Sequence, residues 1–157
     1  MVPDMIERQL VLKASRETVW AALTQADKIS QWFSVRTEID LRPGGKLGLY
    51  WPNNEYSDHG YGGDGRVEVV EPMTRFAFTW RPFAYLQKDR ASIDPSLRLR
   101  VEFTLEDHPR GVRLTMRESG FSRLPEALRS NSFFDNELGW TEELAELVTH
   151  VKSVSGP

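Results

Sequence analysis

Two glutamates are the residues of this sequence best placed for acid–base chemistry or for binding a polar group of a ligand, because each interrupts an apolar pattern. Glu118 follows the inward alternation of Val112, Leu114 and Met116, and Glu137 falls inside the apolar stripe of the predicted last helix. Apolar surroundings raise the pKa of a carboxyl group and suit it to proton transfer near neutral pH. Strand ends and first helical turns also lie near solvent, where a glutamate complements the helix dipole, so a structural role stays open.

A second acid–base candidate is the adjacent pair Asp58 and His59, which could stand at the mouth of a cavity. The glycine-rich residues 60–65 follow directly. They resemble a phosphate-binding loop in composition alone, because no Lys-Ser or Lys-Thr follows them and they precede a strand instead of a helix. We interpret them as a flexible hairpin tip.

The histidines do not have the spacing of metal ligands. His59, His108 and His150 are too far apart in sequence to form an i, i+2 or i, i+4 pair, and the chain has no cysteine. His150 is expected on the solvent-facing side of the last helix, and His108 adjoins a turn. We therefore expect no metal site and no cofactor.

Composition indicates one domain over residues 1–157, with 20 Lys and Arg against 23 Asp and Glu and a net charge of −3. Both signs are mixed along the chain without a basic block, which argues against nucleic acid as a partner and against stable membrane association. No charged leader precedes an apolar run, and no window approaches about 18 apolar residues. We expect a cytoplasmic protein.

Residues 133–154 are predicted to form one long amphipathic helix. Its apolar side chains, placed at 100° per residue, fall on one face: Phe133, Trp140, Leu144, Leu147, Val148, Val151 and Val154. So broad a stripe must be covered, and the large apolar surface available is a sheet made by the preceding segments. A long helix held by a curved sheet predicts a cavity between them.

The segments before this helix alternate with a period of two, which is typical of strands. The predicted strands cover residues 5–13, 33–41, 46–51, 65–70, 75–81, 97–106 and 112–116, and two short helices cover residues 16–24 and 26–32. Short turns join most strands, which favours an α+β fold with an antiparallel sheet. Residues 82–96 form a longer connection with large apolar side chains, which we interpret as a mobile flap or a dimer contact.

Five segments, taken in order, resemble the bacterial single-domain homologues of the carboxy-terminal domain of the activator of heat-shock-protein-90 ATPase. They are IERQLVLKASRETVWAALTQADKISQWF, DLRPGGKL, GDGRVEVVEPMTRFAFTW, RLTMRESGF and GWTEEL. That group belongs to the START-like, or SRPBCC, superfamily. The resemblance implies a helix-grip fold, in which about six to seven antiparallel strands wrap around a carboxy-terminal helix. It also implies a hydrophobic cavity for lipids, polyketides or other small apolar molecules.

We expect this cavity to be lined from both the sheet and the last helix. The candidate ligand-binding residues are Trp51, Phe78, Trp80, Phe103, Met116, Glu118, Phe134, Glu137, Trp140, Leu144 and Val148. The alternation leaves open whether Tyr50 or Trp51 faces inward. The leading interpretation is a protein that binds a small hydrophobic or amphipathic ligand without converting it, and a homodimer is possible.

Two other functions stay open. One is a co-chaperone-like interaction module for a heat-shock ATPase, and the other is a cyclase-type or hydrolase-type enzyme that uses the carboxylates. A basic docking surface for an acidic partner is less favoured, because Arg100 and Arg117 share the outer parity of the strands with Glu102. Cross-strand ion pairs explain that pattern.

Overall fold

The computed structural model describes residues 2–34, 36–51, 65–82, 94 and 96–155. The pair Asp58 and His59, the glycine-rich residues 60–64 and most of the 82–96 connection lie outside the described residues. The predictions made for those segments therefore stay predictions. Within the described residues, the predicted α+β helix-grip fold is confirmed.

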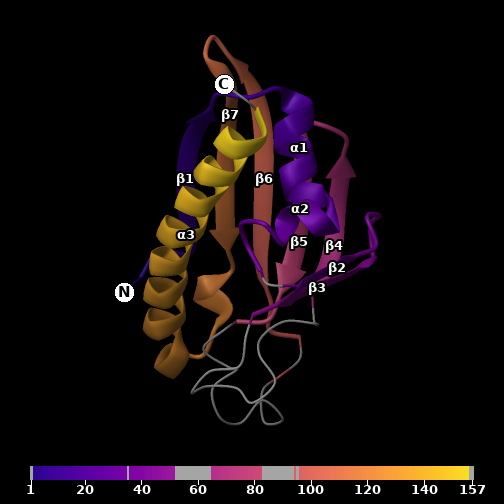
Figure 1. The fold of residues 1–157 in the computed structure, drawn as a ribbon. Coiled ribbons are helices and arrows are strands. Elements are labelled where there is room, and N and C mark those ends of the chain that lie inside the picture. The colour runs from indigo at the N-terminus through magenta and orange to yellow at the C-terminus, as the bar shows by residue number, and fades with distance from the viewer. Residues whose placement is uncertain (1, 35, 52–64, 83–93, 95, 156–157) are drawn as a thin grey trace.

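Seven strands form one antiparallel sheet in the spatial order β1-β7-β6-β5-β4-β3-β2 (Figure 1). The strands are β1 (Met5–Leu12), β2 (Arg36–Ile39), β3 (Lys46–Tyr50), β4 (Gly65–Glu71), β5 (Arg75–Trp80), β6 (Leu99–His108) and β7 (Gly111–Ser119). β2 to β7 pair in chain order as a meander. The first strand then pairs with the last along its whole length, from Met5 opposite Ser119 to Leu12 opposite Val112.

The helices cover one face of this sheet. They are α1 (Arg16–Thr24), α2 (Ala26–Ile29), the 3-10 helix η3 (Phe121–Arg123) and α3 (Glu126–Ser155). Figure 1 shows α3 crossing β1 and β7 obliquely, with α1 and α2 beside it over the neighbouring strands. The inward side chains of β6, such as Val101 and Phe103, are at most 2% exposed. Burial of these alternating side chains beneath α3 builds the core.

Local interactions fix the first helix. The Ser15 hydroxyl accepts a hydrogen bond from the Thr18 amide at 3.1 Å and caps α1. Arg16, the first helical residue, donates from Nη1 to the carbonyl oxygens of Met73 at 2.6 Å and Leu105 at 3.1 Å. This one side chain therefore ties α1 to the turn after β4 and to β6.

The long helix begins seven residues earlier than predicted, at Glu126 instead of Phe133. Pro125 begins the first turn, and its carbonyl oxygen accepts from the amides of Leu128 and Arg129. Proline is compatible with a helix start because its missing amide hydrogen has no helical acceptor there. The apolar stripe did not indicate this start, because residues 126–132 are mostly polar or small and do not extend the stripe.

The predicted strand over residues 33–41 is wrong in its first part, because β2 covers only Arg36–Ile39. The amide of Phe33 donates to the carbonyl oxygen of Ile29 at 2.9 Å, so Phe33 still belongs to the turn that follows α2. Its ring is buried in the core. Period-two alternation could not separate a short strand from the apolar end of the preceding turn.

The expected solvent-facing position of His150 is also wrong. His150 is only 8% exposed. Burial lowers the pKa of His150, and the charge of Lys28 from α2 lowers it further. If α3 packed on the sheet alone, the side of α3 that carries His150 would be exposed to water. Here the short helices cover that side.

Candidate functional site

Glu118 lies at the centre of a buried hydrogen-bond network between sheet and helix. Its side chain points inward from β7 and is fully buried. Oε2 accepts from Trp80 Nε1 at 2.7 Å and from Asn136 Nδ2 at 3.1 Å. Oε1 accepts from Trp140 Nε1 at 2.9 Å and from the same Asn136 Nδ2 at 3.0 Å. One carboxylate therefore joins β7, β5 and two successive turns of α3.

The electrostatics of Glu118 are a balance between burial and hydrogen bonding. Burial raises the pKa of Glu118 and the hydrogen bonds from Trp140, Trp80 and Asn136 lower it, and the net result is a rise from 4.5 to about 7. No Lys, Arg or His in the described residues forms an ion pair with it. The three side chains bonded to Glu118 all present N–H donors, which is the arrangement that an ionised carboxylate requires.

A pocket of about 130 Å³ opens beside this network. Its lining residues are Phe33, Trp51, Trp80, Asp135, Asn136, Gly139, Trp140 and Glu143. The indoles of Trp80 and Trp140 belong both to the pocket wall and to the Glu118 network. Glu118 itself is not among the described lining residues; it lies behind the wall and holds two of its rings.

The aromatic part of the wall is a set of rings in mutual contact. The Phe33 ring is stacked on Trp140 with centroids 5.4 Å apart and meets the edge of Trp51 at 5.3 Å. Trp80 lies 5.9 Å from both Phe33 and Trp140. Because each ring is held by its neighbours and two are also held by Glu118, the wall is organised before any ligand arrives.

Side chains fill most of the described core around Phe76, Phe78 and Phe103. A second space, enclosed by residues that include Phe76, Phe78 and Phe103, has a volume of only about 10 Å³. That volume is at the lower limit of about 10–15 Å³ that a single water molecule needs. The room for a ligand in the described structure therefore lies at the pocket beside Trp140, near the first half of α3.

The predicted ligand-binding residues occupy four kinds of position. Trp51, Trp80 and Trp140 line the pocket. Glu118 lies behind it, while Phe78, Phe103, Met116 and Leu144 are at most 4% exposed in the core, and Val148 packs on the core half-buried. The structure thus brings three of the predicted aromatic residues together with Glu118.

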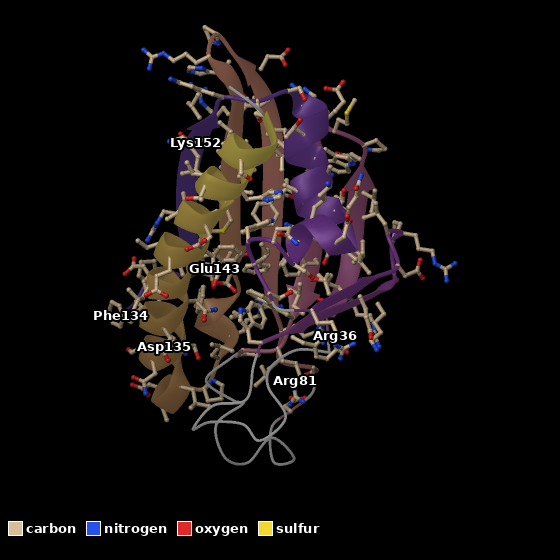
Figure 2. The ribbon with its side chains drawn as sticks, viewed as in Figure 1. Arg36, Arg81, Phe134, Asp135, Glu143 and Lys152 are labelled. Carbon is tan, nitrogen blue, oxygen red and sulfur yellow. The ribbon has the colours of Figure 1, made fainter. Side chains whose placement is uncertain are left out.

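Two predicted residues lie on the solvent side of α3. Phe134 is 57% exposed, and in Figure 2 its ring points away from the sheet. The Glu137 side chain is 41% exposed and its Oε2 lies 3.6 Å from Arg8 Nη2 of β1. Both residues are outside the lining of the pocket, because α3 is rotated so that Asn136 and Trp140 face inward.

The open choice between Tyr50 and Trp51 is resolved by the structure. Trp51 is half-buried and lines the pocket. The guanidinium carbon of Arg36 lies 3.9 Å from the centre of the Tyr50 ring. Tyr50 therefore meets a cationic side chain from β2.

Sequence reasoning did not identify Phe33, Asp135, Asn136, Gly139 and Glu143 as site residues. Asn136 carries a readable signal, because it lies four residues before Trp140 and is a polar residue in the buried stripe of α3. Asp135, Gly139 and Glu143 repeat every four residues beside that stripe. The rotation of α3 relative to the sheet, which decides their direction, depends on packing against α1 and α2.

Gly139 is unusual because the structure gives no packing reason for it. A glycine in the interior of a helix costs about 1 kcal/mol relative to alanine. A Cβ atom built on Gly139 would meet no atom within 4 Å. The missing side chain therefore leaves the pocket open at the surface of α3.

No metal or membrane feature emerges from the part of the chain that the structure describes. It contains no group of three or more His, Asp or Glu side chains that could hold a metal ion. None of its helices is long and apolar enough to cross a membrane.

The fold and the site together define a class: a helix-grip protein with a pocket between its open antiparallel sheet and its long last helix. The chain matches the family described as "Activator of Hsp90 ATPase homolog 1-like protein" over residues 13–152. It belongs to this family, which confirms the resemblance seen in the sequence. A search of curated proteins finds no match.

Solved structures share the fold across almost the whole chain. Protein MLL2253 from Mesorhizobium loti has a TM-score of 0.73 at 24% identity, covering 94% of this chain and 96% of its own. Protein NE0264 from Nitrosomonas europaea has a TM-score of 0.73 at 17% identity, covering 96% and 95%. The Aha1 dimer from Colwellia psychrerythraea has a TM-score of 0.69 at 16% identity, covering 99% and 100%.

Proposed function

We propose that this protein binds a small, mainly apolar molecule in the pocket formed by Phe33, Trp51, Trp80 and Trp140, without converting it. The observation that carries this proposal is an open aromatic pocket whose two central indoles are anchored on a buried carboxylate. An anchor of that kind restrains the rings in the free protein, so binding loses less side-chain entropy. A packed interface needs neither the opening at Gly139 nor the buried charge.

The size of the pocket limits what it can hold. Its volume of about 130 Å³ is well below the 300 Å³ or more of pockets that enclose drug-sized ligands. It fits a single ring or a branched head group, with the rest of a larger ligand outside. Each 100 Å² of apolar ligand surface removed from water would favour binding by about 2.5 kcal/mol before ordering costs, which makes micromolar affinity reasonable.

Binding without conversion fits the positions of the carboxylates. Glu118 is fully buried, and both of its oxygens already accept hydrogen bonds from protein groups. Glu137 is beside Arg8 at the surface. The two carboxylates therefore do not converge on one exposed point, as shared acid–base chemistry would require.

The test is ligand binding with a variant that fills the opening. A panel of fatty acids, flavonoids, alkylammonium compounds and polyaromatic dyes is followed by intrinsic tryptophan fluorescence and thermal shift. Gly139→Leu places a side chain in the pocket on a residue type that favours helices, so it should abolish binding while leaving circular dichroism unchanged. Thr141→Leu, which places the same leucine side chain on the exposed side of the same helix, should bind like the parent.

The proposal fails if no member of the panel changes the fluorescence or the unfolding temperature. It also fails if Gly139→Leu and Thr141→Leu bind the same compounds equally well. In that second case, binding would occur elsewhere on the protein.

Family membership favours a second candidate, a co-chaperone-like module that acts on a heat-shock ATPase. We rank it lower because two arginines that could form a basic docking surface on the outer sheet face are paired within the chain. Arg100 Nε lies 2.7 Å from Glu68 Oε1, and Arg117 Nε lies 2.6 Å from Glu7 Oε2. Steady-state ATPase rates with and without excess protein test it: we expect no change, and a several-fold rise would reverse the ranking.

We also propose that two copies associate through the outer side of α3. Phe134 is 57% exposed and Leu138 is 63% exposed, and their i, i+4 spacing places them side by side on the helix. Neighbouring large apolar side chains in water are typical of contact surfaces. The similar Colwellia psychrerythraea protein is described as a dimer.

The cytoplasmic location stays a prediction.

A further inference from the structure

The wall of the pocket contains two carboxylates that the binding of a neutral molecule does not use. Asp135 and Glu143 both line it, and Gly139 lies midway between them in sequence. Residues four apart on a helix stand on the same face, about 6 Å apart along the axis. The opening at Gly139 is therefore flanked by a carboxylate on each side. Figure 2 shows Glu143 on the side of α3 that faces the strands, opposite to Phe134.

These two carboxylates have no cationic partner within the described residues. Neither Asp135 nor Glu143 forms an ion pair there, although many other glutamates and aspartates do. Burial and the negative charges of Glu146 and Glu142 together raise the pKa of Glu143 to about 7. Once ionised, Asp135 and Glu143 place negative charge in a wall that contains no described lysine, arginine or histidine.

The aromatic wall of the pocket favours a cation as well. The faces of tryptophan and phenylalanine rings carry negative charge density and attract cations, most strongly in tryptophan. Trp80 and Trp140 also donate their indole N–H groups to the Glu118 carboxylate. Hydrogen bonding to a negative group shifts electron density toward the rings, so it strengthens their attraction for a cation. None of the described residues that line the pocket is a lysine, an arginine or a histidine.

We propose that the ligand of this pocket is a small organic cation whose alkylated ammonium group lies against Trp80 and Trp140, between Asp135 and Glu143. This inference rests on the proposed function and narrows its ligand class. An alkylated ammonium group is apolar on its surface and positively charged, so it matches both the rings and the carboxylates. A fatty-acid carboxylate placed in the same pocket would meet like charge and be rejected.

The experiment compares two ligands of the same shape that differ in charge. Choline and 3,3-dimethylbutan-1-ol differ by the exchange of the ammonium nitrogen for carbon. Titration of the intact protein is followed by the indole N–H signals in nitrogen-15 NMR spectra, which detect weak binding. We expect choline to bind at least tenfold more tightly than the alcohol. Phenyltrimethylammonium and tert-butylbenzene repeat the comparison with an aromatic ring attached.

Charge removal in the wall provides the second readout. The double variant Asp135→Asn and Glu143→Gln keeps the shape of both side chains, and we expect it to weaken choline binding at least fivefold without changing binding of the alcohol. Glu126→Gln makes a single neutralisation at the exposed start of α3, about 25 Å from Glu143 along the helix, and should leave choline binding unchanged.

The outcomes separate this inference from the proposed function. If neutral compounds bind as tightly as their cationic isosteres, and Gly139→Leu abolishes that binding, the pocket binds ligands but the cation inference is overturned. Equal choline affinity in the double variant and the parent would overturn it as well. If neither member of either pair binds, the inference and the proposed function both fail.

Discussion

Glu118 is a buried carboxyl group that accepts hydrogen bonds from N–H donors and has no cationic partner among the described residues. Its pKa is raised from 4.5 to about 7 because burial outweighs the hydrogen bonds from Trp140, Trp80 and Asn136. Between these two values the folded protein binds more protons at this site than the unfolded chain does. The contribution of Glu118 to stability therefore falls by about 3 kcal/mol as the pH rises from about 4.5 to 7.

We expect Glu118→Gln to remove most of this pH dependence. Urea unfolding at several pH values between 4.5 and 7.5 measures the slope for the parent and for the variant. Glu143 has a raised pKa too, so Glu143→Gln is the matched control; its smaller burial predicts a smaller change. His150, whose pKa is lowered, gives a slope of the opposite sign, but it is present in all three proteins. Parallel curves for the parent and Glu118→Gln would contradict the prediction.

A second prediction concerns Gly139. Its replacement by alanine should raise the free energy of unfolding by about 1 kcal/mol, because the helix gains propensity and the new methyl group meets no atom within 4 Å. For a protein of this size, that gain raises the unfolding temperature by about 2 to 4 °C.

Gly65→Ala is the contrasting control, since a Cβ atom there would meet the carbonyl oxygen of Leu47. It should lower the unfolding temperature. A drop for Gly139→Ala would instead show that the space beside Gly139 closes in solution, which would also weaken the case for a pocket.

At the scale of elements, Arg16 joins α1 to the turn after β4 and to β6 through three hydrogen bonds. Its Nη1 reaches the carbonyl oxygens of Met73 and Leu105, and its Nη2 lies 2.7 Å from Asp107 Oδ1. We expect Arg16→Ala to reduce the free energy of unfolding by about 2 kcal/mol, because two carbonyl groups lose a charged donor.

Asp107→Ala separates the carbonyl contacts from the ion pair. The Asp107 side chain is 95% exposed, so its loss should change stability by less than about 0.5 kcal/mol. Chemical denaturation of both variants under one condition makes the comparison. Equal losses of stability in the two variants would mean that the ion pair with Asp107, and not the two carbonyl contacts, holds α1 in place.

The periodicity of apolar residues correctly predicted the strands and helices that have one buried face and one solvent-exposed face. The strand that contains Val101 and Phe103, and the helix that contains Trp140 and Leu144, follow from alternation and helical spacing alone. Periodicity gave wrong boundaries where the chain changes direction, as at Phe33, and where a helix begins with polar residues, as at Glu126. Such boundaries depend on hydrogen bonds and packing that a local pattern does not contain.

Only part of the candidate site could be predicted, because the rotation of α3 also depends on packing that a local pattern does not contain. Glu118 and the tryptophans interrupt or enrich simple patterns, and they were identified. Asp135, Gly139 and Glu143 look like ordinary surface positions of a helix until its rotation is known. A turn of one residue, or 100°, decides whether Asn136 or Glu137 meets Glu118.

For the whole molecule, we expect a dimer in solution. Leu138→Glu places a charge in the centre of the exposed apolar side of α3 and should shift the protein to a monomer in sedimentation velocity. Thr149→Glu, also exposed on this helix but away from Phe134 and Leu138, should leave the dimer intact. A parent protein that sediments as a monomer at high micromolar concentration would contradict the proposed association.

The pairing of the first strand with the last has a consequence for synthesis. β1 finds its partner only when β7 exists, because Met5 pairs with Ser119 and Leu12 with Val112. At ribosomal rates of about 5–20 residues per second, the edge of β1 waits about 5 to 20 seconds for that partner. During this time its backbone donors and acceptors are open to other nascent chains. The sheet therefore closes late, and β1 is an unpaired edge in the newborn chain until β7 has been made.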